Sequence, residues 1–333
     1  MSLLDLALGA LVAFALLPEL VRFGPLRRGS PRVLAALELG GLVGWAILPF
    51  ALLSCFGDAL ATVIVSGRIG AGGCWMGVAA SKWRLLGIAA GGLAVLPLLW
   101  QGWRTVRAVQ RVELKGLCRH AAELHTLASG ASVWVLPSPV PTAYAAGVLN
   151  PAAVVTSAVL DPLGAVERQA VLEHEAAHVE LGHPRLLVLA AIIVQAYGML
   201  PSVRRGWHSL RRELEAAADD EAVRSVGRDA VLSALAQVAL AQAGGTLSFG
   251  EPEYLRYRIS RLEGPPAPSR AASAAVVAVS VAMVGLLAWT ACVLVSGGAV
   301  FLGELACVGG AAAVASRPLW AWHRVGRGCK RLP

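Results

Sequence analysis

The residues best suited to chemistry form the run His174-Glu-Ala-Ala-His178. On a helix, residues four apart lie on the same face, so both imidazoles can bind one metal ion. Glu175 follows the first histidine and can act as general base towards a water that the metal activates. The flanking residues are mostly small or apolar, as a buried active-site helix requires. Glu173 and Glu180 place one edge of this helix in a polar environment.

A catalytic zinc site commonly has three protein ligands and one open position, so a third ligand is needed. His183 lies nearby, but its spacing is one residue short of a known zinc-binding pattern, and we expect it to cap the helix instead. Glu215 is the better candidate, because Asp219 lies four residues later and can hydrogen-bond a ligand imidazole. A solvated acidic helix face paired with neighbouring arginines is the alternative, and without the histidine motif it would be the better interpretation. After that motif, the metal site is favoured.

Four polar residues are candidates for stabilising an oxyanion at this site, and the sequence does not choose among them: His208, Tyr254, Tyr257 and Arg258. His208 lies two helical turns before Glu215, so it can face the same site.

The composition indicates an integral membrane protein. Of the 333 residues, 56% are hydrophobic and 15% are charged, and the mean hydropathy is +0.64, which is too apolar for a soluble domain. The net charge is +8, but the basic residues cluster beside apolar runs rather than among aromatics, so we expect no direct contact with nucleic acid. Cys55 and Cys74 either form a disulfide outside the cell or are unrelated, and the sequence leaves both open.

We expect five membrane-spanning segments, at about 3–21, 33–55, 84–103, 271–295 and 298–316. Clusters of arginine place the loops after the first and third segments in the cytoplasm. The N-terminus should therefore lie outside the plasma membrane, with the catalytic residues and the C-terminus inside. The first segment lacks the basic start of a signal peptide, so we expect it to be retained.

The predicted fold is mainly α: a polytopic membrane protein with a cytoplasmic α+β peptidase domain. We predict membrane helices in residues 1–103, the peptidase domain in 104–264, and a membrane hairpin with a basic tail in 265–333. The peptidase domain should contain helices at 104–128, 207–226, 228–243 and 254–263, strands at 132–136 and 153–156, and a motif helix that starts at Asp161-Pro162.

The apolar segment 185–200 decides whether the metal site can form. If this segment crossed the membrane, Glu215 and His174 would lie on opposite sides. Its length is short for a span. We therefore expect a buried, re-entrant or membrane-surface segment that returns to the cytoplasmic side.

His174-Glu-x-x-His178 followed by Glu215-x-x-x-Asp219 resembles the membrane-embedded gluzincin metallopeptidases. Upstream, 141–147 and 152–157 resemble the edge strand that aligns the substrate in those enzymes. The arrangement of spans resembles one branch, the β-lactam sensor-transducer (BlaR/MecR) antirepressor peptidases. The chain has no Ser-x-x-Lys motif of a penicillin-binding sensor domain, so β-lactam sensing does not follow from the resemblance.

The resemblance implies a set of roles for residues of this chain. His174, His178 and Glu215 would bind one Zn²⁺ per chain, Glu175 would activate water, and Asp219 would support a ligand. The peptide would lie antiparallel along an edge strand made of Ala153, Val154, Val155 and Thr156. The implied partners are a protein substrate, of which a winged-helix transcriptional repressor is the form typical of this branch, and the lipid bilayer. The sequence does not determine whether the protein forms an oligomer.

Three functions remain open at this point. The first is a zinc endopeptidase that cuts a cytoplasmic protein in regulatory signalling. The second keeps the chemistry but acts in membrane-protein quality control or on prenyl-type protein substrates. The third is a receptor or scaffold that no longer hydrolyses peptides, and the intact Glu175 argues against it.

Overall fold

The computed structural model describes residues 18, 22, 29–66, 89–93, 95–105, 107–108, 123–127, 132–148, 151–243, 252–264, 273–278 and 281. The predicted segment 298–316 and Cys74 lie outside these residues. Only parts of the predicted segments 3–21, 84–103 and 271–295 lie within them.

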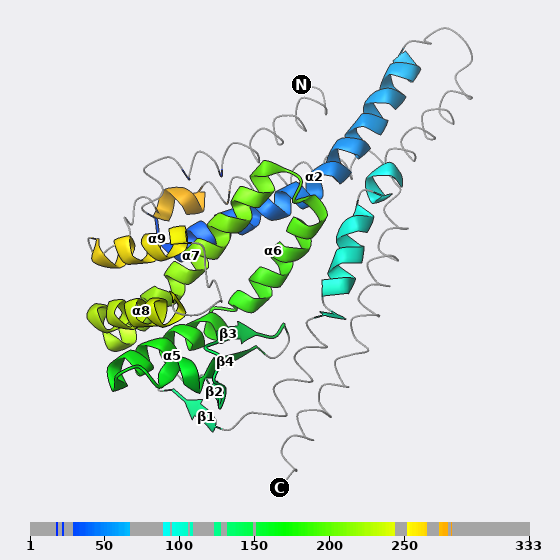
Figure 1. The fold of residues 1–333 in the computed structure, drawn as a ribbon. Coiled ribbons are helices and arrows are strands. Elements are labelled where there is room, and N and C mark those ends of the chain that lie inside the picture. The colour runs from blue at the N-terminus through cyan, green and yellow to red at the C-terminus, as the bar shows by residue number, and fades with distance from the viewer. Residues whose placement is uncertain are drawn as a thin grey trace.

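A four-stranded mixed sheet lies beside the motif helix (Figure 1). Its strands are β1 (Glu123–Thr126), β2 (Ser132–Leu136), β3 (Ala143–Ala146) and β4 (Ala152–Thr156), in the order β1-β2-β4-β3. The sequence predicted β2 and β4. The helix predicted over 104–128 was wrong at its end, because residues 123–126 pair antiparallel with β2; residues 109–122 are not among those described.

The sheet order corrects the predicted substrate strand. β4 is parallel to β2 on one side and antiparallel to β3 on the other, and Ala153, Val154, Val155 and Thr156 are all buried. A strand with both edges paired cannot accept a peptide. The outer strand next to the motif helix is β3, which hydrophobic alternation could not identify because it is short and rich in alanine.

The motif helix α5 (Ala165–Glu180) packs on this sheet through apolar side chains, among them Leu172 and Ala176. A short helix, α4 (Ser157–Leu160), precedes it. Asp161 and Pro162 form a turn between the two helices and do not start α5, whose N-cap is Gly164. Arg168 fixes this turn by donating hydrogen bonds to the carbonyls of residues 160 and 163.

Helices α6 (His183–Tyr197) and α7 (Pro201–Val226) form a hairpin that brings Glu215 back beside α5 (Figure 1). The chain after 185–200 thus returns to α5, as the metal site requires, and the side of a membrane on which it lies stays a prediction. Helices α8 (Arg228–Ala243) and α9 (Pro252–Glu263) lie close to the predicted boundaries. Helix α8 packs against α5, and α9 packs against α7.

A long helix, α2 (Pro31–Ser66), runs along α7 and α6 (Figure 1). Leu42 of α2 packs with Val203 and Leu210 of α7 in one buried cluster. Gly206 permits this close approach, because a Cβ there would lie 3.1 Å from the Leu42 side chain.

The described residues contain fewer candidate membrane spans than the five that the sequence predicts. Within the described residues, only Pro31–Pro49 is long and apolar enough to cross a membrane by itself, with a mean hydropathy of 1.4. Helices α5 and α6, which are bent by 61° relative to each other, reach that length and hydropathy only as a pair. The described part of the chain therefore contains one candidate membrane helix near the N-terminus.

Candidate metal centre

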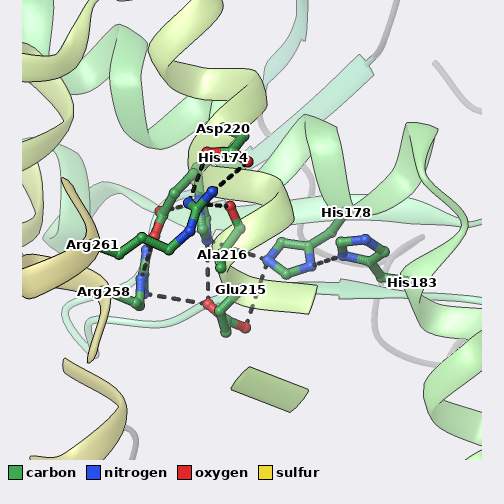
Figure 2. Close-up of polar contacts among 9 residues, drawn as sticks. His174, His178, His183, Glu215, Ala216, Asp220, Arg258 and Arg261 are labelled. Carbon is green, nitrogen blue, oxygen red and sulfur yellow. Dashed lines mark hydrogen bonds and ion pairs between the residues drawn. The ribbon is translucent and has the colours of Figure 1, made fainter. Parts of the chain in front are cut away.

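Three side chains from two helices converge on one point: His174 and His178 from α5, and Glu215 from α7 (Figure 2). The Nε2 atoms of the two histidines lie 3.2 Å apart. Glu215 Oε2 lies 3.5 Å from His174 Nε2, and Glu215 Oε1 lies 3.7 Å from His178 Nε2. The structure thus brings together the three residues that the sequence proposed as ligands.

These separations fit a tetrahedral zinc ion. Ligand atoms about 2.0–2.1 Å from a tetrahedral centre are about 3.3 Å from one another. Two imidazoles and one carboxylate are also a donor set of catalytic zinc sites, in which the fourth position stays open. The three side chains therefore suit one Zn²⁺ ion.

Asp219 and Arg258 lie behind His174. Asp219 Oδ1 is 3.0 Å from His174 Nδ1, somewhat off the axis of the N–H bond. Arg258 donates two hydrogen bonds to Asp219, at 2.8 and 2.6 Å. A carboxylate can only accept a hydrogen bond, so His174 Nδ1 carries the proton and Nε2 is left to bind metal.

The charges of the site follow from burial and from this pairing. Burial raises the pKa of Asp219, but the Arg258 guanidinium and His174 outweigh it and hold that pKa well below its usual range. Burial likewise opposes the charge of Glu215, yet the two histidines and Arg258 keep its pKa low. Both carboxylates are therefore ionised at neutral pH.

The two ligand histidines differ in basicity. Burial and Arg258 lower the pKa of His174, but the carboxylates of Asp219 and Glu215 outweigh them and raise it to about 9. Burial lowers the pKa of His178 to about 4. In the metal-free protein at neutral pH, His174 is therefore protonated and His178 is neutral.

His183 supports the second histidine, a role that the sequence analysis missed. Its Nδ1 atom lies 2.8 Å from Nδ1 of His178 (Figure 2), and only 2% of His183 is exposed. We expected His183 to cap the motif helix; it instead begins α6, directly after Gly182. The positive φ of Gly182, 70°, allows the sharp turn that returns the chain to His178. Burial lowers the pKa of His183 to about 3, so it is neutral.

Glu175 lies in a pocket with the three ligands. This pocket has a volume of about 380 Å³ and is lined on one side by β3 and on another by apolar side chains of α8. Burial raises the pKa of Glu175 to about 7. A carboxylate with such a pKa can accept and return a proton near neutral pH.

A comparison with protein families matches residues 110–276, half of the chain, to peptidase family M48. The chain belongs to this family. Peptidases of family M48 are typically zinc-dependent, which agrees with the ligand geometry. The match supports a zincin-type metallopeptidase and does not select the β-lactam sensor branch. No curated protein matches the chain, and no solved structure does.

The structure separates the four oxyanion candidates of this M48 chain. Tyr254 and Arg258 line the pocket, and Arg258 lies 3.3 Å from Glu215 Oε2. His208 is largely exposed and has its Nδ1 atom 2.8 Å from the Tyr254 hydroxyl. Tyr257 donates to the buried Glu213 instead and does not line the pocket. Tyr254 and Arg258 are therefore the candidates that the geometry keeps at the site.

Helix α9 is fixed to α7 by two arginine–aspartate pairs, which the sequence analysis also missed. Besides Arg258 with Asp219, Arg261 binds Asp220 through two hydrogen bonds of 2.7 and 2.8 Å (Figure 2). A signal was present, because two arginines three apart follow two adjacent aspartates along the chain. Sequence spacing alone could not show that α9 lies against α7.

Proposed function

We propose that this protein is a zinc-dependent membrane endopeptidase that hydrolyses peptide bonds of a cytoplasmic protein. The observation that carries the proposal is the geometry of the three ligand atoms, 3.2–3.7 Å apart, with Glu175 in the same pocket. Membership of family M48 supports the peptidase chemistry.

His174, His178 and Glu215 would hold the zinc ion, and Asp219 and His183 would orient the two imidazoles. When bound, zinc lowers the pKa of a coordinated water to about 7 and polarises the scissile carbonyl. Glu175 accepts the proton of the attacking water and then delivers it to the leaving amine, because its pKa of about 7 suits both transfers. Tyr254 and Arg258 are the groups placed to stabilise the oxyanion.

The substrate would bind as an extended strand along β3. Ala143, Tyr144 and Ala145 line the pocket, and β3 is the outer strand on this side of the described sheet. A peptide that adds to such an edge gains main-chain hydrogen bonds that do not depend on its sequence. Affinity would then come from β3, and selectivity from the side-chain pockets.

The proposed location is the plasma membrane, with the catalytic pocket on the cytoplasmic side. One candidate membrane helix, Pro31–Pro49, lies against α7, and M48 peptidases are often membrane-associated. The clusters of arginine beside apolar runs support a cytoplasmic pocket. The five-span arrangement and the three-part division at residues 103 and 264 belong to this proposal.

Replacing the base tests the chemistry. We expect Glu175→Gln to lower the rate of peptide cleavage by about 10²–10⁴-fold, because general-base catalysis is lost, while the zinc content stays at one per chain. Glu215→Ala should instead lose the zinc itself. Glu180→Gln is the matched control on the same helix, since Glu180 is exposed to solvent. Full cleavage by Glu175→Gln would overturn the proposal.

The substrate is identified with the same variant used as a trap. Glu175→Gln, purified gently from its native membrane, should retain a substrate that wild-type protein releases as fragments. A single small DNA-binding repressor would establish the antirepressor function. Many membrane or damaged proteins would indicate quality control. A partner bound equally by both forms, without fragments, would indicate a scaffold.

A further inference from the structure

Helix α6 carries an apolar surface that the described residues of the protein leave partly exposed. Residues 186–194 read Leu-Leu-Val-Leu-Ala-Ala-Ile-Ile-Val and contain no polar side chain. Of these nine residues only Ala190 and Ile193 are buried, and the other seven keep part of their surface accessible. Leu189 is 42% exposed, and Met199, just beyond the helix, is 83% exposed. A helix that is apolar on all sides is normally covered by protein or by lipid.

The length of α6 excludes a crossing. Its 15 residues span about 22 Å at about 1.5 Å per residue, which is less than the roughly 30 Å of a bilayer core. The chain then turns at residues 198–200 and returns through α7. The hairpin can therefore enter a membrane from one side and leave by the same side.

Helix α7, which leads away from this apolar tip, begins with basic side chains. Arg204 and Arg205 on the first turn of α7 are both exposed. Basic side chains one or two turns from an apolar tip can reach lipid phosphates while their stems stay in the apolar layer. A protein surface that meets only water needs no apolar tip, so the combination favours a lipid surface.

A neighbouring helix marks the level of the membrane surface. Within residues 95–105, Gly102 lies against Ile192, and the Thr105 hydroxyl is 3.4 Å from the Gln195 side-chain oxygen. Trp100 and Trp103 on this helix are stacked 5.3 Å apart and are 57% and 46% exposed. Exposed tryptophans concentrate where the acyl region meets the headgroups. The end of α6 thus lies beside a helix whose exposed tryptophans indicate a membrane surface. This observation is separate from the apolar composition of α6.

We propose that the α6–α7 hairpin is re-entrant: its tip, residues 189–201, inserts shallowly into the bilayer. Leu189 and Met199 contact the acyl chains, and Arg204 and Arg205 contact the phosphate groups of anionic lipids. This inference concerns the membrane and does not depend on peptidase activity. Helix α6 begins at His183 and α7 carries Glu215, so both helices of the hairpin reach the metal centre. A tip bound to lipid would therefore connect the membrane to the metal centre through these two helices.

Cysteine labelling tests the insertion. The six native cysteines are replaced by serine in the full chain, and Met199→Cys or Leu240→Cys is added. Leu240 is the matched control, an apolar residue of α8 that is 73% exposed. Each variant is reconstituted into vesicles of phosphatidylcholine and phosphatidylglycerol, and a charged maleimide is introduced on both sides by freeze–thaw. One zinc per chain verifies the fold of each variant.

We expect the cysteine at 199 to react at least about tenfold more slowly than that at 240 in vesicles, and at a similar rate in detergent with a small headgroup. A nitroxide lipid labelled near the headgroup should quench a fluorophore at 199 more strongly than a lipid labelled at the end of the acyl chain. Equal reaction rates in vesicles would overturn the proposal, since the tip would then lie in water. Protection that persists in detergent, with a crosslink between two chains, would show that a second copy covers the tip.

The basic arm is tested separately. Arg204→Gln with Arg205→Gln should speed labelling at position 199 by a few fold in vesicles that contain phosphatidylglycerol, and leave it unchanged in pure phosphatidylcholine. Arg185→Gln, at the other end of α6, is the control and should change neither rate. An identical effect of the double substitution in both lipids would remove the anionic lipids from the proposal.

Discussion

His174 and His178 lie one turn apart on α5 and face the same point, yet the groups behind them differ in charge. His174 is backed by Asp219, which is 1% exposed and held by Arg258. His178 is backed by His183, a neutral imidazole fixed by the turn between α5 and α6. Both arrangements orient a ring, but only the first adds negative charge.

This difference shows how one helix can supply two unlike ligands. The carboxylate behind His174 makes that ring more basic, with a pKa of about 9, whereas the pKa of His178 is about 4. The first support depends on α9, which carries Arg258, and the second on α6, which carries His183. The metal centre is therefore tied to two separate parts of the fold, one charged and one neutral.

The largest effect should follow from breaking the charged support. Arg258→Met leaves Asp219 buried without its cation, so we expect the free energy of unfolding to fall by about 3–5 kcal/mol. The double variant Arg258→Met with Asp219→Asn should recover much of this loss, because no unpaired charge stays buried. Chemical denaturation with and without zinc measures both.

Arg261→Met is the matched control for that experiment. Arg261 binds Asp220 between the same two helices, but the side chains are 23% and 30% exposed. A partly exposed pair contributes about 0–1 kcal/mol. If the two variants lose the same free energy of unfolding, both arginines merely hold α9 against α7. The buried charge of Asp219 behind His174 would then make no extra contribution to stability.

Zinc affinity should also differ between variants of Asp219, which supports His174, and variants of His183, which supports His178, and this effect should be smaller than the effect on stability. Asp219→Asn should weaken zinc binding by about 10–100-fold, since the ligand loses its anionic partner. His183→Ala should cost about tenfold or less, and His183→Asn, which keeps a hydrogen-bond acceptor, should cost less than His183→Ala. Competition with a fluorescent chelator gives these constants. A greater loss from His183→Ala than from Asp219→Asn would reverse the comparison.

The smallest expected effect is on the number of protons released when zinc binds. Because the pKa of His174 is about 9 in the metal-free protein, this residue carries a proton at pH 8, while Glu175, with a pKa of about 7, is mostly ionised and His178 is neutral. Zinc should therefore displace the His174 proton at pH 8, in addition to the proton that the metal-bound water loses, whereas well above pH 9 only the water proton should be released.

Calorimetry in buffers of different ionisation enthalpy measures how many protons are released when zinc binds. Asp219→Asn should reduce the count at pH 8, because the pKa of His174 falls without the carboxylate, and His183→Asn should leave the count unchanged. A wild-type count at pH 8 that is no larger than the count well above pH 9 would mean that His174 is neutral before zinc binds.

The ligands and their immediate chemistry could be predicted because they depend on local geometry. The spacing of His174 and His178 fixes them on one face of a helix, and the same holds for Glu215 and Asp219. Strands β2 and β4 and helices α8 and α9 follow from short-range periodicity in the same way. His183 was misjudged because its role needs the turn at Gly182, whose positive φ no side-chain pattern reveals.

The substrate strand was misplaced for a related reason. Ala153–Thr156 has the composition of a strand, but whether a strand is internal or at the edge depends on which strands pair with it. That order, β1-β2-β4-β3, joins segments that are not consecutive in the chain. Arg258 was one of four candidates in the sequence, and only the packing of α9 on α7 placed it against Asp219.

The sequence by itself determined what one helix face can hold: two imidazoles, a neighbouring base, and a carboxylate pair ready to complete a zinc site. It also determined an apolar chain suited to a membrane. Only the tertiary structure decided that the apolar segment after the motif turns back, which strand borders the pocket, and which charge stands behind each ligand. Side-chain spacing within a helix is set by the helix geometry, whereas contacts between distant segments are set by packing of the whole core, which no single stretch encodes.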